Sequence, residues 1–255
     1  MWSLRLRLEL LRWRLAGRRA RLWWRDDDAW EPTPELERLL GLAGDAAVPL
    51  TLAVIPAGDI TGLAAVLAHR SGVTAVQHGV DHRNRRLGPA AGEFPHDWPL
   101  SRLKSELSLG WTRLAGLPGA LAVFVPPWND VHPRLEAALE ACGYRAWSAH
   151  GELAAAGLPR VDAHLDLLRW RGGSRFRGRG RMLAALTSAL ARRRRSRLWA
   201  APIGLLTHHL AHDEAAWRFL AKFLAWSTGR TELEWVSLRS LVPAPGAVAH
   251  SRNAA

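Results

Sequence analysis

The stretch LWWRDDDA, residues 22–29, places three apolar residues directly before four charged ones. We predict a buried strand over Leu22–Trp24, so that the charged block lies where this strand ends. Seven more short β-rich runs follow along the chain: Leu50–Ile55, Val73–Val76, Leu121–Val125, Tyr144–Ser148, Val161–Ala163, Ile203–Leu206 and Glu234–Val236. Helical patterns separate these runs, which predicts a mostly parallel sheet and, at this spacing, a single (β/α) barrel, distorted or incomplete, with about seven strands.

The helical patterns between these runs carry recognisable end signals. Pro34 opens a predicted helix that extends to Leu42, and Gly143 ends a helix that starts at Pro133. Three other helices are preceded by side chains that can accept hydrogen bonds from the first free N–H groups. These caps are Asp59 before Ile60–His69, Ser101 before Arg102–Leu114 and Asp213 before Glu214–Trp226.

Composition excludes several classes of protein. Hydrophobic residues make up 48% of the 255 residues and charged residues 23%, which is typical of a globular chain and excludes a largely disordered one. The single cysteine, Cys142, excludes a disulfide framework and a cysteine-ligated zinc module. No uncharged stretch is long enough to span a membrane, because Pro118, Pro126 and Pro127 interrupt the longest one, Leu114–Asn129.

The formal net charge is +12, and only Lys104 and Lys222 among the 35 basic residues are lysines. Such a charge can indicate a nucleic acid or an anionic membrane as a partner. A coding bias toward arginine, with the charges on solvated faces, is the simpler interpretation. The arginine clusters, Arg5–Arg21 and Arg169–Arg197, do not show the aromatic interleaving of a single-strand binding surface. We therefore expect no nucleic-acid partner.

The chain is expected to contain one catalytic domain, residues 21–243, between a basic N-terminal segment, residues 1–20, and a loose C-terminal tail, residues 244–255. Arginines interrupt the N-terminal segment too often for a secretory signal, which together with the lone thiol indicates a cytoplasmic protein. The leucines of this segment fall on one helical stripe: Leu4, Leu8, Leu11 and Leu15. We expect the stripe to pack on the domain itself, with peripheral membrane contact as the alternative.

Polar clusters follow four of the predicted strands. They are Asp26–Asp28 after the first strand, His78 and His82 after the third, Pro127–Asn129 after the fourth and His208–His209 after the seventh. In a barrel of parallel strands these positions share the C-terminal face, where catalytic groups gather. Residues far apart in the sequence are therefore expected to line one pocket.

His78 and His82 are four residues apart, a spacing that allows two imidazoles to bind one divalent ion. A carboxylate from the aspartate triplet would complete a set of two histidines and one aspartate with open coordination positions. A second aspartate could then take a proton from water. The plainer alternatives are a helix-capping region around the histidines and a solvated turn at the triplet.

Two further clusters add candidates to this pocket. His208 or His209 can act as a general acid because imidazole titrates near neutral pH. Alternation along a strand directs only one of the two into the barrel mouth. Trp128 follows two prolines and would form a rigid aromatic wall of the kind that sugar-binding clefts use. The structural alternatives are a hydrogen-bonded core histidine and a packing role for the indole.

In this order, the four clusters resemble the motifs of the polysaccharide deacetylase family, also called the NodB-homology group or carbohydrate esterase family four. That family has an Asp-Asp pair after its first strand, a His-Ser/Thr-x-x-His motif, an Arg-Pro-Pro-Tyr/Trp-type motif and a late Leu-x-His motif. The corresponding segments here are Asp27-Asp28, His78-Gly-Val-Asp-His82, Val125-Pro126-Pro127-Trp128 and Leu206-Thr207-His208. The resemblance covers nearly the whole chain, residues 22–241.

The resemblance implies a metal-dependent hydrolase that removes an acetyl or other acyl group from an N-acetylated sugar or glycan. Asp27 would be the general base and His208 the general acid. The cofactor would be a divalent metal ion, with zinc expected, on three ligands: Asp28, His78 and His82. The carbohydrate substrate would contact three residues of the third motif: Pro127, Trp128 and Asn129.

The aspartate triplet permits a second register, in which Asp26 and Asp27 form the pair, and His209 is the alternative acid. We prefer the later pair because Ala29 then occupies the position of the family's small residue. Both registers place one carboxylate on the metal and leave its neighbour to act as the base.

Two positions depart from the family pattern. Val125 stands where the family has an arginine that orients the catalytic aspartate, and Gly79 replaces the hydroxyl residue between the histidines. Arg25 could orient the aspartate instead, and His164 and Asp166 could supply further orienting or substrate contacts. An O-acetyl esterase and a catalytically decayed relative that binds glycans are the alternative functions.

Overall fold

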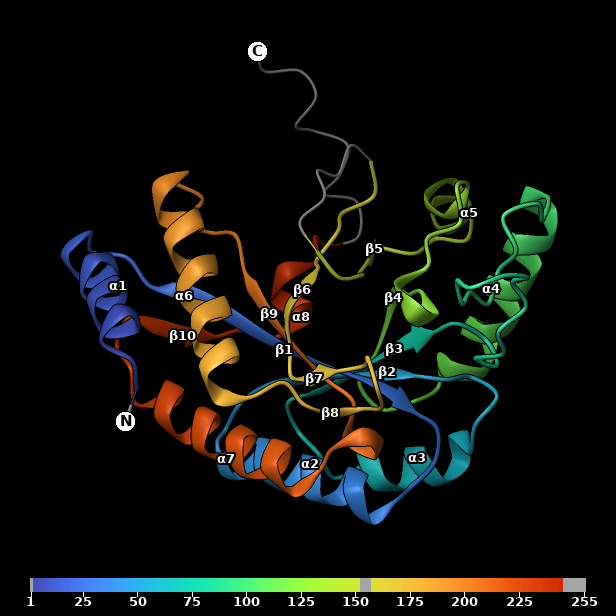
Figure 1. Ribbon diagram of the computed structural model, residues 1–255. Coiled ribbons are helices and arrows are strands. Elements are labelled where there is room, and N and C mark those ends of the chain that lie inside the picture. Colours follow the sequence, from blue (N-terminus) through green and yellow to red (C-terminus); the bar gives the residue numbers. More distant parts are fainter. Residues whose placement is uncertain (1, 152–156, 245–255) are drawn as a thin grey trace.

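The computed structural model describes residues 2–151 and 157–244 of the chain. Within these residues, eight strands form one parallel sheet, which curves with helices along its outer side (Figure 1). The strands of this sheet are β1 (Ala20–Ala29), β2 (Leu50–Val54), β3 (Val73–His78), β4 (Ala120–Val125), β5 (Ala146–Trp147), β6 (Ala163–Asp166), β9 (Ile203–Thr207) and β10 (Leu233–Trp235). Two short strands, β7 (Leu168–Arg169) and β8 (Arg175–Phe176), form a separate antiparallel hairpin.

The strand order is β5-β4-β3-β2-β1-β9-β6, and β10 pairs with the first residues of β1. Isolated parallel bridges, Trp147 to Arg160 and His150 to Ala163, link the region of β5 to that of β6. The sheet therefore curls into a distorted (β/α) barrel, which confirms the predicted fold class. Strand β1 is an inner strand and pairs with β2 on one side and β9 on the other.

Helices surround the sheet from α1 and α6 through α7, α2 and α3 to α4 and α5 (Figure 1). Their bounds are α1 (Leu4–Leu15), α2 (Pro34–Asp45), α3 (Ile60–Leu67), α4 (Leu100–Leu114), α5 (Leu135–Ala141), α6 (Arg179–Arg195), α7 (Glu214–Thr228) and α8 (Leu238–Leu241). Asp59 and Asp213 cap α3 and α7 as predicted, each accepting a backbone N–H three residues further on. The predicted Ser101 cap is wrong, because α4 already begins at Leu100, directly after Pro99.

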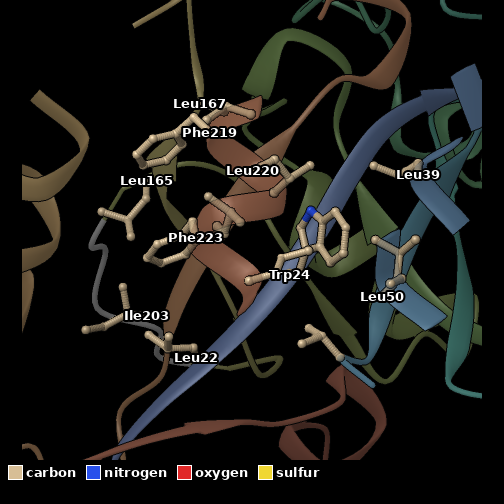
Figure 2. Close-up of a cluster of buried hydrophobic side chains, with 14 of the residues drawn as sticks. Leu22, Trp24, Leu39, Leu50, Leu165, Leu167, Ile203, Phe219, Leu220 and Phe223 are labelled. Carbon is tan, nitrogen blue, oxygen red and sulfur yellow. The ribbon is translucent and has the colours of Figure 1, made fainter. Parts of the chain in front are cut away.

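The side chains on the two faces of β1 belong to two separate apolar clusters. Leu22 and Trp24 point outward into the layer between sheet and helices, where they lie near Leu220 and Phe223 of α7 (Figure 2). Trp23 points inward and fills the barrel together with residues of β2, β3 and β4. Its indole N–H donates to the carbonyl of Asp162 across the barrel. This alternation is the ordinary two-residue period of a strand.

Helix α1 packs on α6 through the face opposite to the one expected from the leucine stripe. Leu6, Leu10 and Trp13 are buried, and the Trp13 indole N–H donates to the carbonyl of Leu190. Glu9 is also buried and is bound by two arginines, Arg12 and Arg194. The N-terminal segment is thus a helix that packs on the domain, but the predicted contact stripe is wrong. Its members are exposed: Leu4, Leu8, Leu11 and Leu15.

No helix among the described residues is both long and apolar enough to cross a membrane. The cytoplasmic location and the three-part division of the chain stay predictions. Most of the predicted C-terminal tail, residues 244–255, lies outside the described residues.

The contrast between the two faces of α1 can be measured. We expect Trp13→Ala to lower the free energy of unfolding by about 3–5 kcal/mol, since it removes a fully buried aromatic side chain. On the same helix, Leu15→Ala should change it by only about 0.5 kcal/mol, because this leucine is 78% exposed. Urea unfolding of both variants tests this packing. Equal losses in the two variants would contradict it.

Candidate active site

The carboxyl end of β1 carries the three consecutive aspartates, and strand alternation separates the first two. Arg25 and Asp27 share the inward parity of Trp23, whereas Asp26 shares the outward parity of Trp24. The pairing of β1 with β2 shifts register between Asp26 and Ala29. Within this irregular segment Asp28 adopts a left-handed backbone conformation with φ of 69°. This turn brings Asp28 to the same cavity as Asp27.

Asp28 meets two histidines from the end of β3. Its Oδ1 lies 3.1 Å from His78 Nε2 and 3.3 Å from His82 Nε2. Among the described residues, one group of His, Cys, Asp or Glu side chains is close enough to bind a common metal ion. It consists of Asp28, His78 and His82, whose ligand atoms all lie within 4.8 Å of one another. Two imidazole nitrogens and one carboxylate oxygen form a donor set that suits zinc and other first-row divalent ions.

Hydrogen bonds around this cluster orient its ligands. His78 Nδ1 lies 3.0 Å from the carbonyl oxygen of Val125, which requires Nδ1–H as the donor. In the neutral ring this leaves the lone pair on Nε2, directed at Asp28, as metal-binding histidines need. Val125, which stands at the family's arginine position, therefore orients the His78 ring through its backbone carbonyl.

The charges of the cluster are strongly coupled. Burial acts to raise the pKa of Asp28, but the hydrogen bond from His78 and the nearby histidine charges hold it well below its usual range. Burial and the charge of His78 both lower the pKa of His82, which favours its neutral form. Burial acts to lower the pKa of His78, but its hydrogen bond to Asp28 raises it overall. Asp28 is therefore ionised and His82 neutral at neutral pH, and a metal on His78 Nε2 would replace the proton that His78 shares with Asp28.

Asp27 is held by an arginine from its own strand. Arg25 Nε lies 2.8 Å from Asp27 Oδ1, and NH2 of the same guanidinium donates to Oδ2 at 2.9 Å. The remaining nitrogen donates to Ser148 Oγ and to the carbonyl of Ala149 near the end of β5. Both partners of the pair are almost fully buried. A two-point contact of this kind fixes the plane of the carboxylate as well as its position.

The two adjacent histidines after β9 diverge. His208 faces the cavity, where its Nε2 lies 3.9 Å from Asp27 Oδ2. His209 is fully buried on the outer side of the sheet, and its Nδ1 lies 2.5 Å from Asp26 Oδ1. Thr207 Oγ1 also donates to Asp26. The residues of the alternative register, Asp26 and His209, therefore bind each other and do not reach the cavity.

In the pair of Asp26 and His209, each residue favours the charged form of the other. Burial would lower the pKa of His209, but the adjacent Asp26 raises it overall. Burial would raise the pKa of Asp26, and the charge of His209 lowers it overall. The pair is thus a buried ion pair that holds the end of β1 to the segment after β9.

The cavity that these residues share has a volume of about 530 Å³. It is lined by Asp27, Asp28, His78, His82, Trp128, Asn129, His150, Asp166, Trp170, Leu206 and His208. Two half-exposed indoles border it, Trp128 beside the ring of His82 and Trp170 edge-on to the ring of His208. Segments from six parts of the chain thus converge at the carboxyl ends of the strands.

Three other predicted site residues lie elsewhere. Pro127 is buried behind Trp128 and does not line the cavity. His164 lies where the pairing of β6 with β9 shifts register, and its ring accepts the backbone N–H of Gly204 and contacts Arg193, away from the cavity. Arg25 does not line the cavity and reaches it through Asp27 and through Asn129, whose Oδ1 accepts from NH2 at 3.4 Å. Asp166 lies at the cavity wall.

Glu93 is a residue of the site that the sequence analysis missed. Its buried carboxylate accepts the backbone N–H groups of Val80, Asp81 and His82, at 2.9, 2.8 and 3.2 Å. Gly79 has φ of 58°, and a Cβ there would collide with the Glu93 carboxylate. The glycine at the family's hydroxyl position thus leaves room for a carboxylate that holds the loop bearing His82.

His150 and Trp170 were also missed. His150 comes shortly after β5, so the strand-end rule that selected the other clusters could have found it. Trp170 sits next to the β7–β8 hairpin within an arginine-rich stretch and has no periodic signal around it. Glu93 lies in a long connection between β3 and α4, where no pattern distinguishes it from other surface acids.

With this geometry, the chain can be compared with known proteins. No protein-family model and no curated protein matches the sequence. Solved structures match over most of the chain. A Mycobacterium smegmatis protein assigned as a polysaccharide deacetylase has a TM-score of 0.62 at 15% identity, over 88% of this chain and 89% of the other.

Two further structures show the same similarity. A family 4 carbohydrate esterase from Streptomyces lividans, in complex with acetate, has a TM-score of 0.55 at 16% identity over 85% of this chain and 91% of its own. The chitin deacetylase of the fungus Colletotrichum lindemuthianum has a TM-score of 0.54 at 13% identity over 89% and 88%. The fold is that of polysaccharide deacetylases and family 4 carbohydrate esterases. The resemblance noted in the sequence is thus confirmed at the level of the fold.

The outer ion pair makes a testable contribution to stability. His209→Ala should lower the free energy of unfolding by about 3–5 kcal/mol, because it leaves the buried Asp26 carboxylate without its counter-charge. The double variant Asp26→Asn/His209→Ala should lose clearly less than the sum of the single losses. Chemical denaturation of the three variants measures this coupling. Strictly additive losses would contradict a paired role.

Glu93 gives a second prediction on stability. Glu93→Ala should lower the free energy of unfolding by about 3 kcal/mol or more, since three backbone donors lose their acceptor. Glu93→Gln retains one acceptor oxygen and should lose less. The exposed Glu31→Ala is the matched control and should stay near wild type. If Glu93→Ala and Glu31→Ala unfold at the same urea concentration, the loop does not depend on this carboxylate.

Proposed function

We propose that this protein is a metal-dependent hydrolase that removes an acetyl or related acyl group from the nitrogen of an acetylated sugar or glycan. The observation that carries the proposal is the convergence of three kinds of group in one cavity. These are a metal-ligand cluster, a carboxylate held by an arginine and a histidine opposite that carboxylate. The shared fold with deacetylases and carbohydrate esterases supports the same reaction class.

Asp28, His78 and His82 would hold the divalent ion, with zinc as the expected metal. The fit rests on the donor set and on ligand atoms within 4.8 Å of one another. A bound divalent ion would polarise the acyl carbonyl and favour deprotonation of water at neutral pH.

Asp27 would act as the general base. It lies beside the ligand cluster but is bound to Arg25, so that its orientation is fixed. A carboxylate in this position can accept the proton of the attacking water as the new carbon–oxygen bond forms. Arg25 would thereby perform the orienting role that the family assigns to the arginine replaced here by Val125.

His208 would act as the general acid. It lines the same cavity as the ligand cluster, with its Nε2 3.9 Å from Asp27 Oδ2 and its ring in edge contact with Trp170. When the carbon–nitrogen bond breaks, a proton from imidazolium neutralises the departing amine. The products are then a carboxylic acid and a free amino group on the sugar. Trp128 and Trp170 offer aromatic faces to the sugar ring, and Asn129 and Asp166 offer polar atoms to its hydroxyl groups.

Acetate release from purified protein tests the reaction class. Metal-loaded protein should release acetate from N-acetylated glucosamine oligomers and lose this activity on chelation. Preferred release from O-acetylated xylan would instead identify the alternative, an O-acetyl esterase. Absence of release from both substrates by metal-loaded protein would favour the decayed, glycan-binding relative.

The metal cluster can be tested apart from activity. His78→Ala should abolish stoichiometric zinc uptake, since it removes one of three ligands. His150→Ala removes an imidazole from the same cavity but not from the cluster, and should bind zinc as wild type does. Elemental analysis after dialysis gives the metal content of each variant. Equal zinc content in His78→Ala and wild type would refute the ligand assignment.

The base is tested by separating turnover from metal binding. Asp27→Asn should lower kcat by about 10²–10⁴-fold while zinc content stays at wild-type level. The reason is that the amide cannot accept the proton, whereas the three ligands remain. Retained turnover in this variant would assign the base role to a different residue of the cavity.

A further inference from the structure

Helix α1 has two apolar faces, of which the domain covers one. Leu6, Leu10 and Trp13 are buried against the rest of the protein. The leucines of the opposite face are exposed by 70, 46, 45 and 78%: Leu4, Leu8, Leu11 and Leu15. Four leucines in one exposed row on a single helix require an explanation that isolated surface leucines do not.

The arginines of α1 flank this row on both sides. At about 100° per residue, the four leucines fall within a sector of roughly 60° on the helix surface. Arg5 and Arg12 then lie roughly 70–90° to one side of its centre, and Arg7 and Arg14 lie equally far to the other. All four arginine side chains are exposed. The exposed half of the helix is thus a leucine row between two lines of arginines.

Among the described residues, no acidic group forms an ion pair with three of these arginines, Arg5, Arg7 and Arg14, whereas Arg12 pairs with Glu9. Glu9 is the one acidic residue of α1, and it is buried on the domain side between Arg12 and Arg194. Arg18 and Arg19, directly after the helix, are exposed and add positive charge. The surface therefore combines an exposed apolar row with a border of net positive charge.

We propose that α1 lies flat on an anionic lipid surface, independently of the chemistry in the barrel. The leucine row would enter the boundary between headgroups and acyl chains, and the flanking arginines would extend to the lipid phosphates. Charge complementarity selects this partner. A second copy docked face to face would place arginines against arginines, and a nucleic acid would pair the arginines but leave the leucine row in water.

The proposal predicts that both features are needed for binding. The full chain should co-sediment with vesicles of phosphatidylcholine and phosphatidylglycerol in a 7:3 ratio, and at least about tenfold less with phosphatidylcholine alone. A leucine variant, Leu4→Gln/Leu8→Gln/Leu11→Gln/Leu15→Gln, should lose at least about tenfold in affinity. An arginine variant, Arg5→Gln/Arg7→Gln/Arg14→Gln, should lose a similar factor and its dependence on salt.

A matched control separates this surface from general hydrophobicity. Leu87 and Leu109 are exposed leucines outside α1, and Leu87→Gln/Leu109→Gln should bind vesicles as wild type does. Circular dichroism and thermal melting should show that the leucine variant is folded, because its changed side chains are outside the core.

Any one of the following results would overturn the proposal. The first is equal sedimentation with neutral and anionic vesicles. The second is unchanged vesicle binding in the folded leucine variant. The third is a leucine-dependent dimer that forms without lipid in analytical ultracentrifugation. The fourth is displacement of the protein from vesicles by duplex DNA that binds through the arginines alone. Either of these last two results would identify a different occupant of this face.

Discussion

Three consecutive carboxylates at the end of β1 can leave water only if each one gains a counter-charge or hydrogen-bonding partners in its place. Removal of an ion from water costs several kcal/mol unless a counter-charge or hydrogen bonds replace the solvent. The chain meets this constraint with groups from different elements. The partners are His209 for Asp26, Arg25 for Asp27, and His78 with His82 for Asp28. These contacts tie β1 to β3 and to the segment after β9, so the charges that define the site also connect the strands around it.

Strand alternation explains why these partners differ in kind. Asp26 faces the helices, where a histidine on the far side of the sheet neutralises it and solvent has no access. Asp27 faces the barrel, where its arginine leaves one side of the carboxylate toward the cavity. The bulge at Asp28 adds a second carboxylate to the same cavity, next to His78 and His82. A uniform strand would present only one of the three aspartates there.

The sequence indicated the barrel and most of the cavity because strand ends in a parallel barrel meet at one face, as Asp28, His78 and His208 do. Strand alternation along β1 and β9 could also have distinguished the two possible aspartate pairs, because Arg25 and Asp27 must lie on the same face of the strand as Trp23. Glu93 could not be predicted, since it acts only through backbone N–H groups 11–13 residues earlier in the same connection, and no sequence pattern marks such a contact. The packing of α1 was assigned to the wrong stripe because both of its faces are apolar, and periodicity cannot tell which one the domain covers.

The most direct test of this account is a crystal structure of the zinc-soaked protein, with the ion located by anomalous scattering. The account predicts one ion in the barrel mouth, at about 2.0–2.2 Å from a carboxylate oxygen of Asp28 and from one imidazole nitrogen each of His78 and His82. Asp27 should remain on Arg25, outside the coordination sphere. An ion bound at a different group of side chains, or an Asp27 that leaves Arg25 to coordinate the metal, would contradict it.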